Sequence, residues 1–513
     1  MNRPGHSPIE PRAQIASAQA AGPTADEPPP PPSGWVRAEL GELSTLVTSG
    51  SRGWAQHYAA EGAAFIRMGN LDWGTTILDL RTLQRVRPPQ GAEGERTRLQ
   101  AGDILISITA ELGMVALVQE NLGEAYINQH IGLVRTTALA DTHYLAWFIV
   151  SPAGQRELRK KQRGATKIGL GLDDLRAVSV PLAPLPEQHR IVAEIEKQFS
   201  RLDAAVAALK RVQANLKRYR AAVLQAACEG RLVPTEAELA HTEGRGYEPA
   251  CAAAGGAERG AGGMMGDGQR PEELPPGWAG TTLGEIVAPT RPRHHPQDCP
   301  QLPFIGMEHV EAHTMRLLGT VPAAVMKSSA VHFFPGDVLY GRLRPYLNKI
   351  YRPDFEGLCS AEFIVLPPSQ CIDGRFLQYR LNAADFMAFA SHVNEGDRPR
   401  VDFSQLAQYH VWLPPLPEQR RIVAEVGRRL SVIDEMEVAV TANLKRAERL
   451  RQAILKRAFA GELVPQDPHD EPASALLERI RGERAAAGEG KTLGSRRGRP
   501  RKQASELALD LGV

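Results

Sequence analysis

Several features that mark other classes of protein are scarce or absent in this sequence of 513 residues. No run of about 18 apolar residues occurs, so we expect no membrane-spanning helix. The first residues, MNRPGHSPIEPRAQ, lack the apolar stretch of a signal peptide. The five cysteines include no CxxC pair, which argues against a zinc site and against a disulfide framework. These absences favour a protein of the reducing cytoplasm.

The sequence also lacks an excess of charge of either sign. It has 61 Lys and Arg residues against 59 Asp and Glu residues, which gives a net charge of +2. A nucleic-acid-binding protein with a positive field over its whole surface is usually more basic. Any such contacts must therefore come from local clusters of basic residues.

Motifs of catalysis are missing as well. The sequence contains no HExxH zinc motif and no Asn-Pro-Pro-aromatic motif of an adenine methyltransferase. The GEGKT segment at 488–492 suggests a phosphate-binding loop, but Ala485 stands where the first glycine of that motif belongs. We therefore predict no catalytic residues and no metal ligands in this chain.

A long internal repeat is the strongest feature that is present. Residues 186–234 and 417–465 align without a gap at an offset of 231, with 20 of 49 positions identical. Both copies begin with PEQ and end with LVP. Upstream, GWVRAELGEL at 34–43 resembles GWAGTTLGEI at 277–286, and GDIL at 102–105 resembles GDVL at 336–339. The chain is therefore a tandem duplication.

The repeat and the composition between its parts predict the domain organisation. The predicted segments in chain order are a disordered Pro-rich leader (1–33), a first globular domain (34–186), a first helix (187–234), a flexible linker (235–276), a second globular domain (277–416), a second helix (417–465) and a disordered basic tail (466–513).

The repeated segments have the pattern of long helices. Apolar residues recur in alternating steps of three and four, as in the seam of a coiled coil, although Glu437 interrupts the second copy. Pro186 and Pro417 suit a first helical turn, and Gly230 and Gly461 suit a C-terminal cap. A helix of about 43 residues would be roughly 65 Å long.

So long an apolar stripe must be covered, and the other copy has the matching length. Two units related by a two-fold axis would pair these helices antiparallel. The alternative is a helix that packs in one large core. We predict an α+β fold in which two globular α/β domains are separated by an antiparallel coiled coil, in a pseudo-two-fold tandem repeat.

The combination of PLPEQ-x-RIVAE, a long helix and a G-x-LVP ending, used twice behind two dissimilar globular domains, resembles the specificity subunits of type I restriction–modification systems. Segments of the two domains resemble the target recognition domains of that family, notably FIRMGNLDWG at 65–74 and FFPGDVLYGRLRPYLNKIY at 333–351. The resemblance covers about 34–234 and 277–465.

The resemblance implies a function that depends on partners. Each target recognition domain would read one part of a bipartite, asymmetric site in double-stranded DNA. The helices would space the two domains and dock two methylation subunits, and restriction subunits would join the complex. S-adenosylmethionine, ATP and Mg²⁺ would bind those partner subunits and not this chain, and the chain would be cytoplasmic and associated with the nucleoid.

Side chains that suit DNA contact are candidates in both domains, because Arg and Lys reach guanine and phosphates while Asn and Gln read adenine. The candidates in the second domain are Arg342, Arg344, Tyr346, Asn348, Lys349, Arg398 and Arg400. Those in the first domain are Arg67, Asn70, Gln129, Arg163, Thr166 and Lys167. For each of them a solvated loop or an internal hydrogen bond is the competing interpretation, and Asn70 equally suits a turn.

In the tail, Arg497, Gly498, Arg499 and Pro500 resemble the core of an AT-hook, whose arginines enter the minor groove. A non-specific phosphate-binding tail is the alternative. For the whole chain, the alternatives left open are a stand-alone bipartite DNA-binding regulator, a scaffold that uses the helices alone, and the specificity chain of a type I-like type II restriction enzyme.

Overall fold

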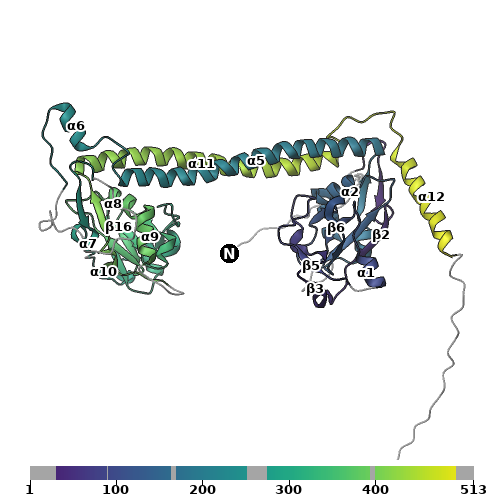
Figure 1. Ribbon diagram of the computed structural model, residues 1–513, viewed down its shortest axis with the longest axis horizontal. Coiled ribbons are helices and arrows are strands. Elements are labelled where there is room, and N and C mark those ends of the chain that lie inside the picture. The colour runs from purple at the N-terminus through teal and green to yellow at the C-terminus, as the bar shows by residue number, and fades with distance from the viewer. Residues whose placement is uncertain are drawn as a thin grey trace, which may run out of the picture. The chain divides into compact units, whose positions relative to one another are not determined.

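The computed structural model describes residues 30–88, 91–162, 169–250, 274–289, 291–392 and 399–492. The chain forms two compact units, of which the first comprises Met1–Ala204 and Arg446–Val513 and the second Ala205–Lys445. Each unit contains one globular domain and a part of each of two long helices. The helices and strands are labelled in Figure 1.

The globular domain of the first unit has two four-stranded sheets. The first sheet has the order β2-β9-β6-β7 and is antiparallel; its strands are Ser44–Ser49, Ile131–Thr136, Ile104–Ser107 and Val115–Leu117. The second has the order β3-β5-β4-β8, with a parallel β4–β8 pair; its strands are Tyr58–Ala59, Gln84–Val86, Ala63–Ile66 and Ala125–Ile127. The helices of this domain are α1 (Ala92–Thr97), α2 (Thr142–Val150), α3 (Pro152–Lys160) and α4 (Leu172–Arg176).

The globular domain of the second unit has a five-stranded and a three-stranded sheet. The five-stranded order is β12-β15-β18-β13-β14, with strands Arg293–His294, Ala330–Phe333, Gly357–Ser360, Pro303–Ile305 and Val321–Pro322. The three-stranded order is β17-β16-β19, with strands Ile350–Tyr351, Val338–Gly341 and Phe363–Leu366. Its helices are α7 (Leu283–Ile286), α8 (Gly374–Leu381), α9 (Ala384–His392) and α10 (Phe403–Leu406).

In each domain the first strand and the last strand form an antiparallel pair, so the beginning and the end of the domain lie side by side. In the first unit β1 (Val36–Glu39) pairs with β10 (Ser179–Leu182), and in the second β11 (Ala279–Thr282) pairs with β20 (His410–Leu413). Because the long helix starts directly after β10 or β20, this pair fixes where the helix leaves the domain.

The repeated Gly-Asp element is structural in both domains. Asp103 and Asp337 are almost completely buried. Asp103 accepts two hydrogen bonds of 2.7 Å from the Arg135 guanidinium, and Asp337 accepts two from Arg291. A buried carboxylate needs such a partner to offset the loss of water, so the repeat retains the aspartate while its arginine comes from different strands and loops.

The two repeated segments form the longest helices, as the sequence predicts. Helix α5 spans Leu185–Cys228 and α11 spans Leu416–Ala458, with 44 and 43 residues. The prolines at 186 and 417 are their second residues. Gly230 and Gly461 follow their ends with φ of 70° and 71°, the left-handed conformation that glycine adopts without steric cost.

The two helices pair antiparallel within each unit (Figure 1). In the first unit the start of α5 shares one hydrophobic core with the end of α11, through residues such as Ile191, Phe199 and Leu455. In the second unit the end of α5 shares a core with the start of α11, through residues such as Val223 and Val426. The predicted antiparallel pairing is confirmed, and each globular domain adds its own apolar residues to the core of its unit.

Two sequence-based predictions need correction. The predicted flexible linker contains a helix, α6 (Glu236–Glu243), and the predicted disordered tail contains α12 (Ala473–Thr492). Ala473, Leu476, Leu477 and Ile480 of α12 are buried in the core of the first unit. Composition misled here because four apolar residues at helical spacing are sufficient to dock a helix whose other residues are charged or small.

Candidate nucleic-acid interface

The polar loop that follows β16 in the second unit contains most of the candidate residues. It includes a single helical turn, η7 (Pro345–Leu347), flanked by Arg344 and Asn348 in the left-handed conformation with φ of 50° and 43°. This conformation is costly for residues other than glycine. Surrounding hydrogen bonds must therefore maintain it, and the loop is held in one shape.

Those hydrogen bonds come from the segment that precedes α10. The Arg344 amide donates to the Pro399 carbonyl at 2.8 Å, and the Val401 amide donates to the Arg342 carbonyl at 3.0 Å. Leu343 and Arg400 form an isolated β-bridge. Two candidate segments that are far apart in the sequence, 342–349 and 399–402, are thus brought together.

The paired segments carry a local cluster of positive charge. Arg342 is half-buried and forms an ion pair with Asp402. Burial is the main cause that lowers the pKa of Arg342. The nearby positive charges of Arg400 and Arg293 lower it further. Arg400 reaches Glu362 only at 3.4 Å and half of its side chain is exposed. Asp402 and Glu362 lie against these two arginines, so part of the positive charge is already matched within the domain.

The remaining candidates in this loop divide into exposed and internal side chains. Arg344 is exposed and the Tyr346 ring is 49% exposed. Asn348 is buried, and its amide donates to the Asn382 carbonyl oxygen at 2.5 Å. Lys349 donates to the Met307 carbonyl at 2.6 Å. In this structure Asn348 and Lys349 hold the loop in shape, and contact of any of these residues with DNA stays a prediction.

The first unit has an equivalent loop after β6. Ala110 has φ of 57° and lies seven residues after the aspartate of the Gly-Asp element, as Arg344 does in the second unit. Thr109 forms an isolated bridge with Gly169, which matches the Leu343–Arg400 bridge. The two domains therefore build the same loop from unrelated side chains. The repeated Gly-Asp element is the sequence signal that locates this loop in both domains.

Candidates of the first unit lie in two places. Gln129 lies near the loop, because its amide is 3.1 Å from His130 Nε2, and His130 Nδ1 is 2.7 Å from the Thr109 hydroxyl. Arg67 and Asn70 lie at the turn η2 (Met68–Asn70). Asn70 is buried, accepts from the Arg67 amide and donates to the Asp79 and Thr82 carbonyls, so it stabilises the turn. The candidates that fall outside the described residues are Arg163, Thr166, Lys167, Arg398 and the tail segment Arg497–Pro500.

The PLPEQ motif joins each domain to its long helix. The Trp35 indole donates to Glu187 at 2.9 Å, and the Trp278 indole donates to Glu418 at 2.8 Å. Burial is the main cause that raises the pKa of both glutamates. The repeated Gly-Trp and Glu residues thus form one buried contact between the first strand of the domain and the first turn of the helix.

The glutamine of the motif extends this contact. Gln188 accepts from the Asp141 amide at 3.0 Å and donates to the Ala183 carbonyl at 2.7 Å. Gln419 makes the equivalent bonds with Asp373 and Pro414, both at 2.8 Å. Asp141 and Asp373 are the N-caps of α2 and α8, so the motif ties a helix of each domain to the start of α5 or α11.

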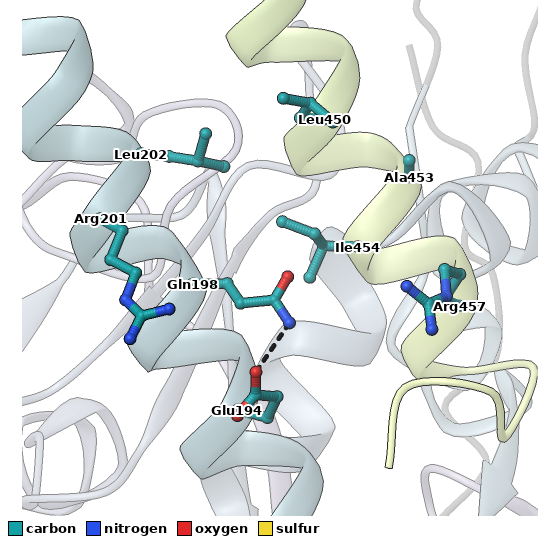
Figure 2. A pocket seen from close by; sticks show the side chains of 8 residues that line it. All are labelled: Glu194, Gln198, Arg201, Leu202, Leu450, Ala453, Ile454 and Arg457. Carbon is teal, nitrogen blue, oxygen red and sulfur yellow. Dashed lines mark hydrogen bonds between the residues drawn. The ribbon is translucent and has the colours of Figure 1, made fainter.

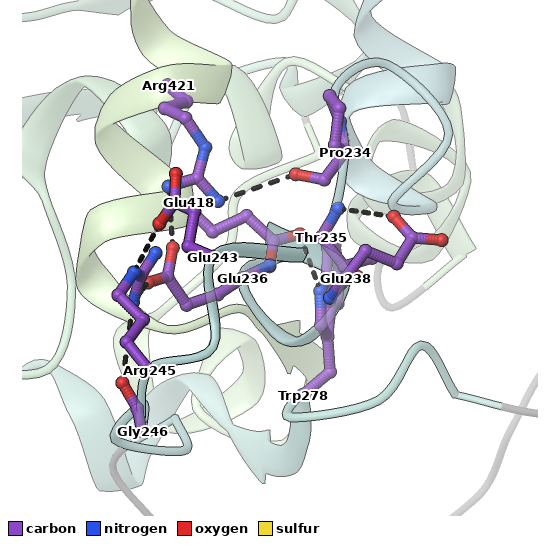
Figure 3. A network of polar contacts seen from close by, with 10 residues as sticks. All are labelled: Pro234, Thr235, Glu236, Glu238, Glu243, Arg245, Gly246, Trp278, Glu418 and Arg421. Carbon is purple, nitrogen blue, oxygen red and sulfur yellow. Dashed lines mark hydrogen bonds and ion pairs between the residues drawn. The ribbon is translucent and has the colours of Figure 1, made fainter. Parts of the chain in front are cut away.

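An arginine that follows the motif binds the segment after the other repeat's helix. In the second unit Arg421 pairs with Glu236 at 2.6 Å, and the Glu236 amide donates to Glu418 at 2.8 Å (Figure 3). Arg245 also pairs with Glu236 at 2.7 Å. In the first unit the equivalent Arg190 pairs with Asp470 at 2.6 Å. The segment that follows the long helix of each repeat therefore contacts the first turns of the other repeat's long helix.

An open groove of about 400 Å³ lies between α5 and α11 in the first unit (Figure 2). Leu202, Leu450 and Ile454 give it an apolar part, and Glu194, Arg201 and Arg457 give it a charged border. Within the described ranges, no group of three or more His, Cys, Asp or Glu side chains could hold a metal ion. No helix among those same residues is long and apolar enough to cross a membrane.

Two unlike domains, joined by the same contacts to a pair of repeated helices, define a duplicated two-domain protein. Residues 32–218 match the family model of the type I restriction modification DNA specificity domain. The type I restriction enzyme EcoDI specificity subunit of Escherichia coli is 28% identical over 68% of this chain and 78% of that protein. The StySPI specificity subunit of Salmonella potsdam is 23% identical over 90% of this chain and 98% of its own length.

A solved structure from work on complex assembly and conformational transition of the type I R-M system has the same fold. Its TM-score is 0.60 at 21% identity, over 85% of this chain and all of that one. Residues 32–218 thus match the type I restriction modification DNA specificity domain, and the chain as a whole is similar to specificity subunits of type I restriction enzymes.

Proposed function

We propose that this chain is the subunit that gives a type I restriction–modification complex its DNA sequence specificity, by reading a bipartite, asymmetric site. The observation that carries the proposal is the contrast between the repeats. Each repeat supplies a long helix and makes the same Trp–Glu and Gln contacts. The exposed loop after β6 or β16, in contrast, presents different side chains in the two domains. Two unlike loops on a repeated frame suit two unlike half-sites.

The proposed division of labour makes the chain a recognition subunit without catalytic residues. Two methylation subunits and the restriction subunits would assemble on it, and the apolar part of the groove at Leu450 is an attachment point of suitable chemistry. S-adenosylmethionine, ATP and Mg²⁺ would be bound by those partners. The complex would act on the nucleoid in the cytoplasm. The exposed Arg344 and Arg400 would contact phosphates or base edges.

The test is co-expression with the cognate methylation subunit in cells without other adenine methylation, followed by single-molecule mapping of methyladenine. We expect one asymmetric motif of two half-sites separated by a fixed gap. Cells that express the methylation subunit alone are the control. A continuous motif, or methylation that does not depend on this chain, would contradict the proposal.

A further inference from the structure

Four charged residues of the long helices are identical between the repeats and pair reciprocally. Asp203 and Arg220 in α5 correspond to Asp434 and Arg451 in α11 at the offset of 231. In the first unit Arg451 of α11 pairs with Asp203 of α5. In the second unit Arg220 of α5 pairs with Asp434 of α11. This reciprocity is what a two-fold arrangement of two equal helices requires.

Both ion pairs correspond to the same register of α5 against α11. Asp203 and Arg220 are 17 residues apart, and so are Asp434 and Arg451. In an antiparallel pair, one residue number rises as the other falls, so both ion pairs form only at a single alignment of α5 on α11. Because each helix is continuous, a slip by one turn would separate both pairs at once.

Each pair also contacts the globular domain of its unit. In the second unit Arg220 is only 9% exposed, and Arg316 of the globular domain pairs with Asp434 at 2.5 Å. Glu437, which interrupts the apolar seam in the sequence, lies within 3.4 Å of both arginines. In the first unit Arg451 donates to the Gly74 carbonyl of the globular domain at 3.2 Å, and it stacks over the Phe199 ring at 4.6 Å.

The arginine of each pair is largely buried, whereas Asp203 is 61% and Asp434 40% exposed. Such pairs add little net stability, but a polar residue in a coiled-coil seam specifies register. We propose that Arg220 and Arg451 are positioning residues that set the register of α5 against α11 and hold each globular domain on the helices. The consequence for DNA, a single gap between half-sites, rests on the proposed function.

The first test is a pair of double-mutant cycles on the full chain, read as Tm. We expect Asp434→Arg and Asp203→Arg to lower Tm, because the first places an arginine beside Arg220 and Arg316 and the second places one beside Arg451. The charge swap D203R/R451D should recover more than half of that loss. The swap D434R/R220D should recover a smaller part, because Arg316 stays beside position 434 and Glu437 beside position 220. Arg218→Asp, at an exposed position of α5, is the control. If the Tm of a swapped variant is no higher than the sum of its two single changes gives, the pairing is overturned.

The second test separates register from stability. In the reconstituted methylation complex, the wild-type chain should prefer one gap over gaps one base pair longer or shorter by about tenfold. The D203R/D434R variant should lose most of that preference, and the fourfold swap should restore it. Unchanged gap preference in D203R/D434R would overturn the positioning role. If the wild type shows no gap preference, the proposed function fails, and the Tm cycles still decide the ion pairs.

Discussion

Single residues in the PLPEQ motifs explain why this stretch is repeated so closely. Glu187 and Glu418 accept from a tryptophan of their domain, yet their second oxygens differ. Glu418 Oε2 accepts from the Glu236 amide, whereas Glu187 Oε1 is buried without a hydrogen-bond partner in the structure. An unsatisfied buried carboxylate oxygen is costly, while a satisfied one is not. Equivalent substitutions in the two repeats should therefore have opposite effects.

We predict that Glu418→Gln lowers the free energy of unfolding by about 1–3 kcal/mol, because its amide would face the Glu236 amide as donor against donor. Glu187→Gln should leave stability at pH 7 unchanged or raise it, because a neutral amide costs less to bury than a carboxylate. Urea denaturation of both variants measures this. Equal effects in the two repeats would show that the second oxygen does not matter.

The same glutamate predicts a pH dependence. Burial raises the pKa of Glu187 above its ordinary value of 4.5. The folded state then binds this proton more tightly than the unfolded state, so the contribution of Glu187 to stability falls as pH rises from 4.5 through the raised pKa. We expect the difference in unfolding free energy between E187Q and wild type to grow over this window. A difference that does not vary with pH would contradict the burial of this carboxylate.

Arg344 offers a substitution that separates folding from DNA contact. Its φ of 50° suits glycine, so Arg344→Gly should keep stability or raise it by up to about 1 kcal/mol. Binding of the assembled complex to its DNA should weaken by about 1–3 kcal/mol. Fluorescence anisotropy and urea denaturation are the measurements. Wild-type affinity in this variant would exclude Arg344 as a contact.

Asn348→Ala is the matched comparison for that loop. Its side chain is buried against Asn382, so this substitution should reduce stability by about 1–3 kcal/mol. Any loss of DNA affinity should accompany the loss of folded protein. The sequence predicted the loop but not this difference, because Arg344 and Asn348 have equally suitable chemistry and only the backbone decides which side chain is exposed.

At the scale of elements, the long helices could be predicted because their signals agree. Apolar spacing, a proline in the first turn and a glycine after the last indicate the same boundaries, and α5 and α11 start at Leu185 and Leu416. The individual sheets could not be predicted, because several strands are very short. Strands β3 and β17, for example, have two residues each. So short a strand carries no recognisable alternation.

Helix α12 shows why composition failed for the tail. Its charged residues include Arg481, which donates to Glu42, and Arg484, which donates to the Gly41 carbonyl. The Ala473 amide donates to the Gly34 carbonyl. This helix is stabilised by a surface that precedes it by more than four hundred residues, and no local pattern reveals such a partner.

We predict that Leu476→Ala destabilises the first unit by about 2–5 kcal/mol, because Leu476 is 1% exposed in its core. Glu478→Ala, at an exposed position of the same helix, should change stability by less than about 0.5 kcal/mol. Thermal unfolding of the full chain compares them. Equal Tm values for the two variants would show that α12 does not contribute to that core.

At the scale of the whole molecule, duplication separates what must stay the same from what can change. The residues that repeat include those that join domain to helix or helix to helix: the Trp–Glu contacts, the glutamines, and the four residues of the reciprocal ion pairs. The loops that would meet DNA differ between Ala110 and Arg344. In the proposed function, the frame fixes positions and the loops carry the sequence preference.

The most direct test exchanges one domain. Residues 277–416 would be replaced by the equivalent domain of a relative with a known motif, the chain would be co-expressed with its methylation subunit, and methyladenine would be mapped. We expect one half-site to change while the other half-site and the gap stay as they were. A change in both half-sites, or in the gap, would contradict the proposal that two domains recognise DNA independently while one pair of helices spaces them.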